Sequence, residues 1–470
     1  MDKTEIPWLT ATELLEHYRR GTLSPVEVTR TVVERAERSQ PLLNAFCVID
    51  PEAALASARE SEARWRRGQP LGLLDGVPVS IKDIVLTKGW PTLRGSRTIP
   101  ANQPWEEDAP SVARLREHGA VLFGKTTTPE FAVGPVTRSP LTGVTRNPWN
   151  VDMTPGGSSG GAGAAVAAGI GPLALGTDAG GSIRIPSSFC GIFGHKPSGG
   201  RVPTWPPTPY ATFAAFGPMT RTVEDAARML TVVSGPDPRD WNALPYDPVP
   251  YHERLDARPL EGMRIAWSPT LGYARVDDEV RQMCEQATRA FTELGAKVET
   301  VAQVFENPMA LISGLREAAT NFAFQSFGED KLAVMDERVA NMIRETRKKA
   351  ATASDYLAVE AERMKFGARM NAFHRDYPLL LTPTVAVPPF SADVWYPAGY
   401  EGDREWWPFT IPFNFTRQPA SSVPCGFTKS GLPVGLHIVG PAHADLLVLQ
   451  ASRAFERVRP WRDARPRVLD

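Results

Sequence analysis

Two short segments rich in glycine and serine, about one helix length apart, constrain this chain more than any other feature. They are Pro155-Gly-Gly-Ser-Ser-Gly-Gly161 and Gly176-Thr-Asp-Ala-Gly-Gly-Ser-Ile-Arg184. Between them lie an alanine-rich helical pattern, Gly161–Gly169, and an apolar run, Leu173–Leu175, typical of a buried strand. Gly/Ser runs are usually flexible linkers, but linkers do not alternate with buried apolar segments. Because glycine permits close backbone approach and unusual dihedral angles, we interpret both segments as parts of one packed structure.

The rest of the chain alternates short apolar runs with helical patterns. Ser24-Pro25-Val26-Glu27 predicts a capped helix start with proline at the first helical position. Strands are expected near residues 77–81, 120–123, 173–175, 263–267, 379–381 and 434–439. Helices are expected over residues 51–67, 110–118, 277–294, most of 305–375, and up to about residue 457. This alternation predicts a layered α/β fold.

Composition limits the classes of partner. The 52 Lys+Arg balance 53 Asp+Glu, and the net charge of -1 gives no electrostatic reason to expect nucleic acid or a membrane surface. The expected partner is a small, roughly neutral molecule. The 4 cysteines are far apart in sequence, which fits a reducing cytoplasm. The first ten residues have no apolar core, so we expect no signal peptide and a cytoplasmic location.

Two motif matches are misleading. Residues 119–126 match the phosphate-loop pattern G-x-x-x-x-G-K-[ST], but Ala, Val, Leu and Phe occupy the middle positions and predict a buried strand. Residues 157–161 match G-x-S-x-G, centred on Ser159, but the residues before them are not strand-like. The chain has 7 histidines, so a Ser-His-Asp triad stays an alternative, while Ser159 is interpreted as structural.

Beyond these segments, several further motifs in the same order resemble the amidase signature family. They are Gly76-Val-Pro-Val-Ser-Ile-Lys-Asp83, Gly124-Lys-Thr126, Asn147-Pro-Trp149, Phe189-Cys-Gly191, Lys196-Pro197, Pro412-Phe-Asn414 and Gly431-Leu-Pro-Val-Gly-Leu-His-Ile-Val-Gly440. The resemblance covers about residues 10–457 and is weakest over residues 236–400. It implies a three-layer α/β/α sandwich with a large mixed central sheet. It also implies one amidase domain over residues 1–470, made of N-terminal helices (10–70), a catalytic core (71–235), a variable helical insert that lines the substrate site (236–410) and a C-terminal segment that completes the sheet (411–470).

The resemblance also implies the catalytic residues. Lys82 matches the family's base, Ser158 its bridging serine after a cis peptide bond, and Ser182 its nucleophile. The expected oxyanion donors are the backbone N–H groups of Ala179, Gly180, Gly181 and Ser182. Lysine can act as a base only if burial keeps it neutral; the alternative for Lys82 is a surface lysine paired with Asp83. A hydroxyl can both donate and accept, so Ser158 can pass a proton between Lys82 and Ser182.

The implied activity is hydrolysis of amide C–N bonds through an acyl-enzyme, without a cofactor or metal ion. Substrates extend to aryl carbamates, urethanes and esters, and a homodimer is compatible with the resemblance. The alternative is the glutamine-hydrolysing subunit of a tRNA-dependent amidotransferase, which usually continues from Lys-Pro into Tyr-Gly-Arg-Val. Here the continuation is Ser198-Gly-Gly-Arg-Val202, which favours a stand-alone hydrolase. A non-catalytic scaffold is the remaining alternative, disfavoured because all three catalytic positions are intact.

Several other positions bear on the substrate site. Expected substrate contacts are Phe131, Ala132, Gly134, Trp205 and Trp395. Trp406 and Trp407 are further candidates for an aromatic pocket, with ordinary packing as the alternative. Asp178 and Arg184 are expected to form an ion pair that holds the nucleophile loop, with substrate contact as the alternative. Departures from the family pattern occur at His195, Gly199 and Arg417.

Overall fold

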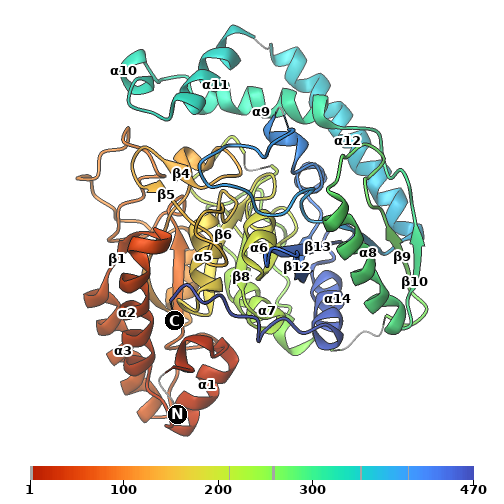
Figure 1. The fold of residues 1–470 in the computed structure, drawn as a ribbon. Helices are drawn as coiled ribbons and strands as arrows, with labels where there is room; N and C mark the ends of the chain where they lie inside the picture. Colours follow the sequence, from red (N-terminus) through yellow and green to blue (C-terminus); the bar gives the residue numbers. More distant parts are fainter. Residues whose placement is uncertain (1–3, 211, 257–259, 350–351, 401, 470) are drawn as a thin grey trace.

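A mixed eleven-stranded sheet runs through the computed structural model, which describes residues 4–210, 212–256, 260–349, 352–400 and 402–469. Across the sheet the described strands follow the order β1-β3-β2-β6-β8-β7-β12-β13-β11-β9-β10 (Figure 1). These strands are β1 (Phe46–Ile49), β2 (Pro78–Lys82), β3 (Val121–Thr126), β6 (Leu173–Asp178), β7 (Phe193–Lys196), β8 (Ala215–Thr220), β9 (Arg264–Trp267), β10 (Lys297–Thr300), β11 (Leu379–Pro383), β12 (Ala420–Phe427) and β13 (Pro433–Val439). The predicted α/β fold with a large mixed sheet is therefore confirmed.

The helices fall on both sides of this sheet and beyond one of its ends. They are α1 (Ala11–Arg20), α2 (Pro25–Leu43), α3 (Pro51–Arg66), α4 (Pro110–Glu117), α5 (Gly160–Ala167), α6 (Arg184–Cys190), α7 (Val223–Val233), α8 (Asp278–Glu293), α9 (Met309–Phe324), α10 (Glu329–Leu332), α11 (Glu337–Lys348), α12 (Ala353–Asp376), α13 (Pro412–Phe415) and α14 (Asp445–Val458). A small hairpin, β4 (Arg138–Ser139) with β5 (Gly143–Val144), lies outside the sheet. None of the described helices is both long enough and apolar enough to span a membrane.

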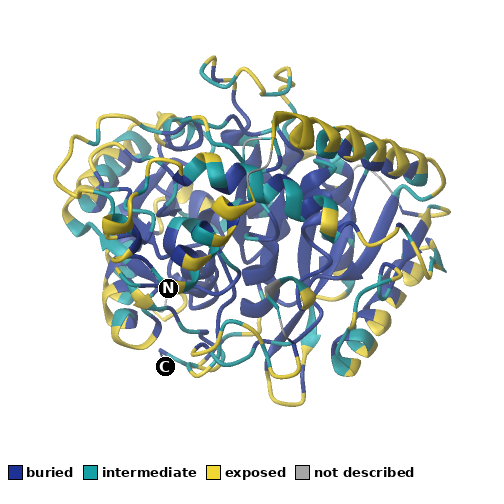
Figure 2. Cartoon of the chain, turned by 90° about the horizontal axis from the view of Figure 1, so that it is seen from above, coloured by how far each residue is buried: buried dark blue, intermediate teal, exposed yellow. Residues whose placement is uncertain are grey.

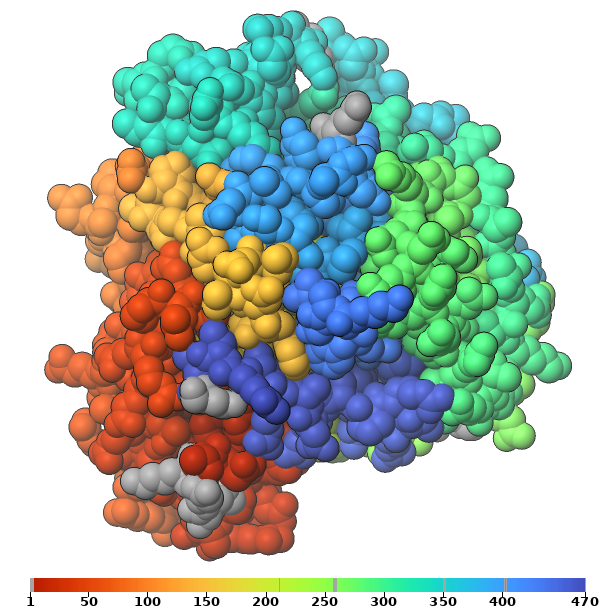
Figure 3. Space-filling view, in the orientation of Figure 1, coloured from red at the N-terminus to blue at the C-terminus, as the bar shows by residue number. Residues whose placement is uncertain are grey.

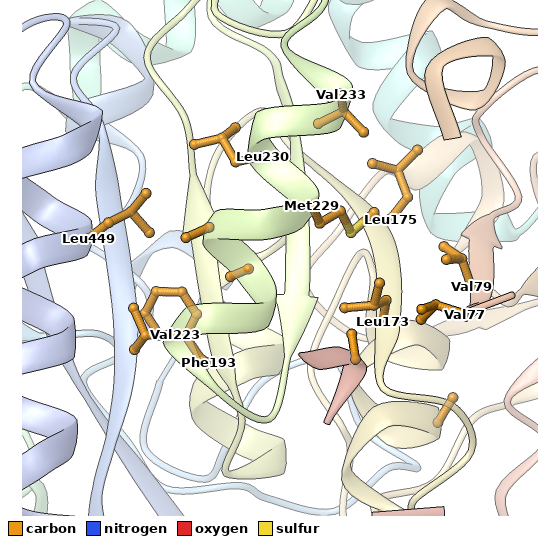
Figure 4. Packing of buried hydrophobic residues seen from close by; sticks show 14 of the residues in the cluster. Val77, Val79, Leu173, Leu175, Phe193, Val223, Met229, Leu230, Val233 and Leu449 are labelled. Carbon is orange, nitrogen blue, oxygen red and sulfur yellow. The ribbon is translucent and has the colours of Figure 1, made fainter. Parts of the chain in front are cut away.

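Alternation along β6 shows why helices cover both faces of the sheet. Successive side chains of a strand point to opposite faces. Leu173 and Leu175 pack in the cluster that contains Met229 and Leu230 of α7 (Figure 4). Ala174, between them, belongs to the cluster with α5 residues on the other face. The central sheet is therefore buried on both sides, as the burial colours of Figure 2 also show.

Local sequence explains several helix boundaries. Ser24 Oγ accepts from Glu27 N at 3.1 Å at the start of α2, at the predicted cap. Gly21, with φ +65°, ends α1 in the left-handed conformation that glycine adopts readily. The predicted helix over residues 51–67 corresponds to α3.

One end of the sheet is covered by the helices that follow β10. In Figure 1, α9, α10 and α11 lie together beyond the sheet, separate from the helices that flank its faces. Residues of α9 and α11 line the same cavity as residues that follow β6. This long helical segment therefore forms part of the wall over that end of the sheet.

Candidate active site

Lys82 lies at the end of β2, directly beside the end of β6. β2 and β6 are parallel, with Ile81 opposite Leu175, so their carboxyl ends meet at the same edge. The Lys82 side chain is fully buried, and its Nζ donates to Ser158 Oγ at 2.7 Å and to Thr177 Oγ1 at 2.9 Å. Burial lowers the pKa of Lys82 to about 7, although the nearby carboxylate of Asp178 opposes this change.

Lys82 is not paired with its neighbour Asp83, which was the alternative from sequence. Asp83 instead lies 3.2 Å from Lys125 Nζ, and its carboxylate accepts from the backbone N–H groups of Leu93 and Gly95. Lys125 is the lysine of the rejected phosphate-loop match, and it lies in β3, every residue of which is buried. The prediction of a strand there is confirmed.

The two adjacent serines face different groups. The Gly157–Ser158 peptide is cis, as the resemblance implies, and Ser158 contacts Lys82 and lines the cavity. Ser159 Oγ is fully buried, donates to the Thr177 carbonyl at 3.2 Å and accepts from Thr177 N at 3.3 Å. Ser159 therefore ties the start of α5 to β6 and does not face the cavity.

Asp178 organises the loop that carries Ser182. Its carboxylate accepts from Gly181 N at 2.7 Å and from Ile183 N at 3.1 Å, and it forms a buried ion pair with Arg184 at 2.9 Å. Burial alone would raise the pKa of Asp178, but Arg184 brings that pKa well below its usual range. Arg184 also donates to Asn414 Oδ1 at 2.6 Å. Of the two predicted roles for Asp178 and Arg184, the structure favours the loop-holding ion pair.

The expected set of four oxyanion donors differs from the structure at one position. The Gly181 N–H already donates to Asp178, and Gly181 does not line the cavity. Ala179, Gly180 and Ser182 do line it, and their backbone N–H groups donate to no other described residue. Gly181 has φ +134°, and a Cβ there would lie 2.3 Å from Thr410 Oγ1, so only glycine fits.

Ser158 and Ser182 line one cavity of 740 Å³. Ser182 is partly exposed to the cavity, and no hydrogen bond joins its hydroxyl to that of Ser158 within the described residues. Catalytic hydrogen bonds often tighten only when substrate is bound. Ser158 and Ser182 therefore share the cavity, and Lys82, which does not line it, reaches it only through its hydrogen bond to Ser158.

Four of the five expected substrate contacts line this cavity: Phe131, Ala132, Gly134 and Trp205. Phe131 and Ala132 have φ of 52° and 58°, a conformation that non-glycine residues rarely adopt. Such outliers often occur in substrate-binding loops.

The predicted contact Trp395 does not line the cavity. Its ring lies under the guanidinium groups of Arg338 on α11, at 4.5 Å, and Arg138 in β4, at 5.1 Å. Trp406 is fully buried and stacks on Phe189, which is the ordinary packing alternative. Trp407 does line the cavity, beside Gly180.

Sequence reasoning missed Thr177 and Arg316. Thr177 contacts Lys82 only because β6 pairs with β2, and the sequence alone does not reveal that pairing. Arg316 is on α9, where no motif marks it, and it reaches the cavity through the tertiary fold.

A serine, histidine and aspartate do come together elsewhere in the chain. His195 Nδ1 is 2.9 Å from Ser421 Oγ, and its Nε2 is 3.4 Å from Asp445 Oδ1. All three side chains are buried and none lines the cavity. This group therefore links β7, β12 and α14 in the interior. These contacts explain why a histidine occupies position 195, where the sequence departs from the family pattern. Among the described residues, no cluster of His, Cys, Asp and Glu has the make-up of a metal site.

Comparison with known proteins identifies the family of this fold. The Amidase family model matches residues 27–449. The chain belongs to the amidase signature family. This family assignment confirms the resemblance seen in the sequence and makes the chain an enzyme of a family that acts on carbon–nitrogen bonds.

The relatives of this chain include an acylamidase and amidotransferase subunits. An acylamidase of Rhodococcus erythropolis is 37% identical over 474 residues, covering 99% of this chain and 98% of that protein. A glutamyl-tRNA(Gln) amidotransferase subunit of Chloroflexus aurantiacus is 34% identical over 488 residues, covering 99% and 100%. The structure of a bacterial aryl acylamidase of the amidase signature family superimposes with a TM-score of 0.88 at 31% identity and covers 97% of both chains.

Proposed function

We propose that this chain is a stand-alone hydrolase of linear, non-peptide amides that works through a Ser182 acyl-enzyme. The supporting observation is the buried Lys82, whose Nζ lies 2.7 Å from Ser158 Oγ and whose pKa burial lowers to about 7. A substantial fraction of Lys82 is then neutral near neutral pH and able to accept a proton.

In the proposed mechanism, Ser182 Oγ attacks the amide carbonyl while its proton passes to Ser158 and that of Ser158 passes to Lys82. The oxyanion accepts hydrogen bonds from the N–H groups of Ala179, Gly180 and Ser182. Each such donor is typically worth about 3 kcal/mol in the transition state. The relay then returns a proton to the leaving nitrogen, and water hydrolyses the acyl-enzyme by the same relay in reverse.

Aryl amides are the first substrates to test, because Phe131, Trp205 and Trp407 line the cavity and a relative is named an aryl acylamidase. We extend the proposal to aryl carbamates and esters, since these present the same carbonyl to the nucleophile. The four free cysteines are consistent with a cytoplasmic location.

The second candidate is the glutamine-hydrolysing subunit of a tRNA-dependent amidotransferase, which the 34% identical relatives favour. The two functions differ in measurable ways. A stand-alone hydrolase cleaves 4-nitroanilides without partners, whereas the amidotransferase subunit releases ammonia from glutamine and co-purifies with other subunits.

The deciding experiment compares three serine variants. Ser182→Ala should abolish anilide hydrolysis and labelling by a fluorophosphonate probe. Ser158→Ala should lower kcat by orders of magnitude, while Ser159→Ala should keep most of it, because the Ser159 hydroxyl hydrogen-bonds only to the Thr177 backbone. Ser182→Ala activity within tenfold of the parent would overturn the assignment of the nucleophile.

A further inference from the structure

The cavity is strongly cationic although the whole chain has a net charge of -1. The cationic side chains that line it are Arg94, Arg316, Lys331, Arg338, Lys349 and Arg404. The carboxylates that line it are Glu317 and Glu345. A wall with this excess of positive charge attracts anions into a partly enclosed space.

The two carboxylates do not neutralise the arginines. Glu317 lies 2.5 Å from Lys349 Nζ, and Glu345 lies 2.6 Å from Lys348 Nζ. Both acidic groups are therefore already paired with lysines of the helical segment. An anion that pairs with Arg316 therefore has to come from outside these two carboxylates.

Of the arginines that line the cavity, Arg316 reaches the loop that carries Ser182. Its Nη1 is 3.4 Å from the position that a Cβ on Gly180 would occupy. Arg316 forms no hydrogen bond or ion pair with another residue of the described chain, and burial lowers its pKa. This half-buried guanidinium is free to pair with an anion that enters the cavity.

Arg404 adds a second guanidinium to this wall, and it also donates to Ser313 Oγ. It lies in the 3-10 turn η4 (Asp403–Glu405) and lines the same cavity as Arg316. Burial, and then the positive charge of Arg316, lower the pKa of Arg404 to about 10. Two guanidinium groups that disfavour each other's charge would both be stabilised by one carboxylate bound between them.

Building on the proposed function, we propose that the preferred substrates are amides that carry a carboxylate a few bonds from the scissile carbonyl, and that Arg316 binds this carboxylate. The planar guanidinium fork matches a carboxylate in a bidentate geometry. Its place beside Gly180, two residues before Ser182, limits the separation between carboxylate and carbonyl to a few bonds. On this proposal the substrate is anionic, whereas the overall charge predicts a roughly neutral molecule.

Matched substrates test the proposal and locate the carboxylate. The acyl-side pair is the mono-4-nitroanilide of succinic acid and its methyl ester. The amine-side pair is 4-acetamidobenzoate and its methyl ester. The parent enzyme should prefer the acid by tenfold or more in kcat/KM for one pair, which identifies the side. A parent enzyme that hydrolyses these amides but prefers neither acid over its ester overturns the proposal.

Variants then test the residue. Arg316→Gln should lower kcat/KM for the preferred acid by about 10- to 100-fold, the range for losing a charged hydrogen-bond donor, and leave its ester within about threefold. Arg316→Lys should recover part of the loss. The matched control is Arg344→Gln on α11, which removes one exposed positive charge, paired with Glu329, that does not line the cavity. An equal loss for acid and ester in Arg316→Gln, or the same loss in Arg344→Gln, overturns the assignment.

A binding measurement separates this inference from the proposed catalysis. In Ser182→Ala, calorimetry should give a Kd for the acid at least tenfold below that for its ester, and Arg316→Gln in that background should remove the difference. Equal Kd values overturn the carboxylate site. Absence of turnover for all four amides in the parent, together with a retained difference in Kd, would instead refute the hydrolase proposal.

Discussion

Lys82 owes its proposed reactivity to its neighbours rather than to its own chemistry. Its Nζ has two hydroxyl partners, Ser158 and Thr177, and no carboxylate within salt-bridge distance among the described residues. Asp178 acts on it through space, but that carboxylate is already paired with Arg184. No ion pair compensates for the desolvation of the Lys82 ammonium group. Its pKa therefore falls, and the neutral amine is populated near neutral pH.

The pH dependence of the reaction follows from this environment. Neutral Lys82 is the competent form, so kcat/KM should rise as pH increases through about 7, the lowered pKa of Lys82. A profile from pH 5 to 9.5 with a neutral anilide measures it. Lys82→Ala and Lys82→Arg should both lose activity by orders of magnitude and lose this limb. If Lys82→Ala keeps the limb, a histidine is the base instead.

Thr177 offers a finer test of the same residue. Its hydroxyl accepts a hydrogen bond from Lys82 Nζ and thereby favours the charged form of Lys82. Thr177→Val should therefore move the pH limb to lower pH, while Thr177→Ser should leave it in place. A limb that is unmoved in Thr177→Val would mean that this hydrogen bond does not tune Lys82.

At the scale of elements, two departures from the family pattern form one contact. Arg417 has φ +61° where the family commonly has glycine, and its Nη2 donates to the Gly199 carbonyl at 2.9 Å. A Cβ on Gly199 would lie 2.5 Å from Arg417 Nε and 3.0 Å from its Cβ. The loss of a side chain at residue 199 thus makes room for the arginine at residue 417.

This contact predicts a coupling between the two positions. Gly199→Ala should lower the free energy of unfolding by about 1–3 kcal/mol, because the added methyl collides with Arg417. The same change in an Arg417→Gly background should cost much less. A double-mutant cycle from urea unfolding measures the difference, and additive costs would contradict the coupling.

Local sequence predicted the strands that have dense apolar runs. It missed strands whose conformation depends on hydrogen bonding to partners that are remote in sequence. The runs at residues 120–123, 173–175 and 434–439 correspond to β3, β6 and β13, which have dense apolar sequences. β8 contains Gly217 and Pro218, residues that argue against a central strand, yet it lies between β6 and β7. Its strand conformation depends on partners that are remote in sequence.

The same limit applies to the candidate site. Lys82, Ser158 and Ser182 were identifiable because they lie in long motifs shared with a family. Trp395 was misplaced as a cavity residue, and Arg316 was missed, because both belong to the segment where the resemblance is weakest. Which side chains of that segment face the cavity is decided by how α9 and α11 pack over the end of the sheet.

At the scale of the whole molecule, the two ends of the chain lie against each other. In Figures 1 and 3 the dark blue C-terminal segment lies beside the red N-terminal helices. Arg462 pairs with Glu13 at 2.6 Å, and Arg38 Nη2 donates to the Leu469 carbonyl at 2.8 Å. Exposed ion pairs of this kind contribute little by themselves. The stability of the contact therefore depends on what the segment buries.

Trp461 is the main buried side chain of that segment. The residue is 8% exposed, its ring packs near Phe455, and its Nε1 donates to the Arg221 carbonyl at 2.8 Å. Trp461→Ala should lower the free energy of unfolding by about 3–5 kcal/mol, since it removes a buried ring and leaves a carbonyl unpaired.

The matched control is Trp241→Ala, where the residue is 90% exposed and the free energy of unfolding should change by no more than about 0.5 kcal/mol. Neither residue lines the cavity, so kcat/KM at a temperature where both variants are folded should match the parent. Urea unfolding of the three proteins measures the difference; equal stability of the two tryptophan variants would show that Trp461 does not anchor the C-terminal segment.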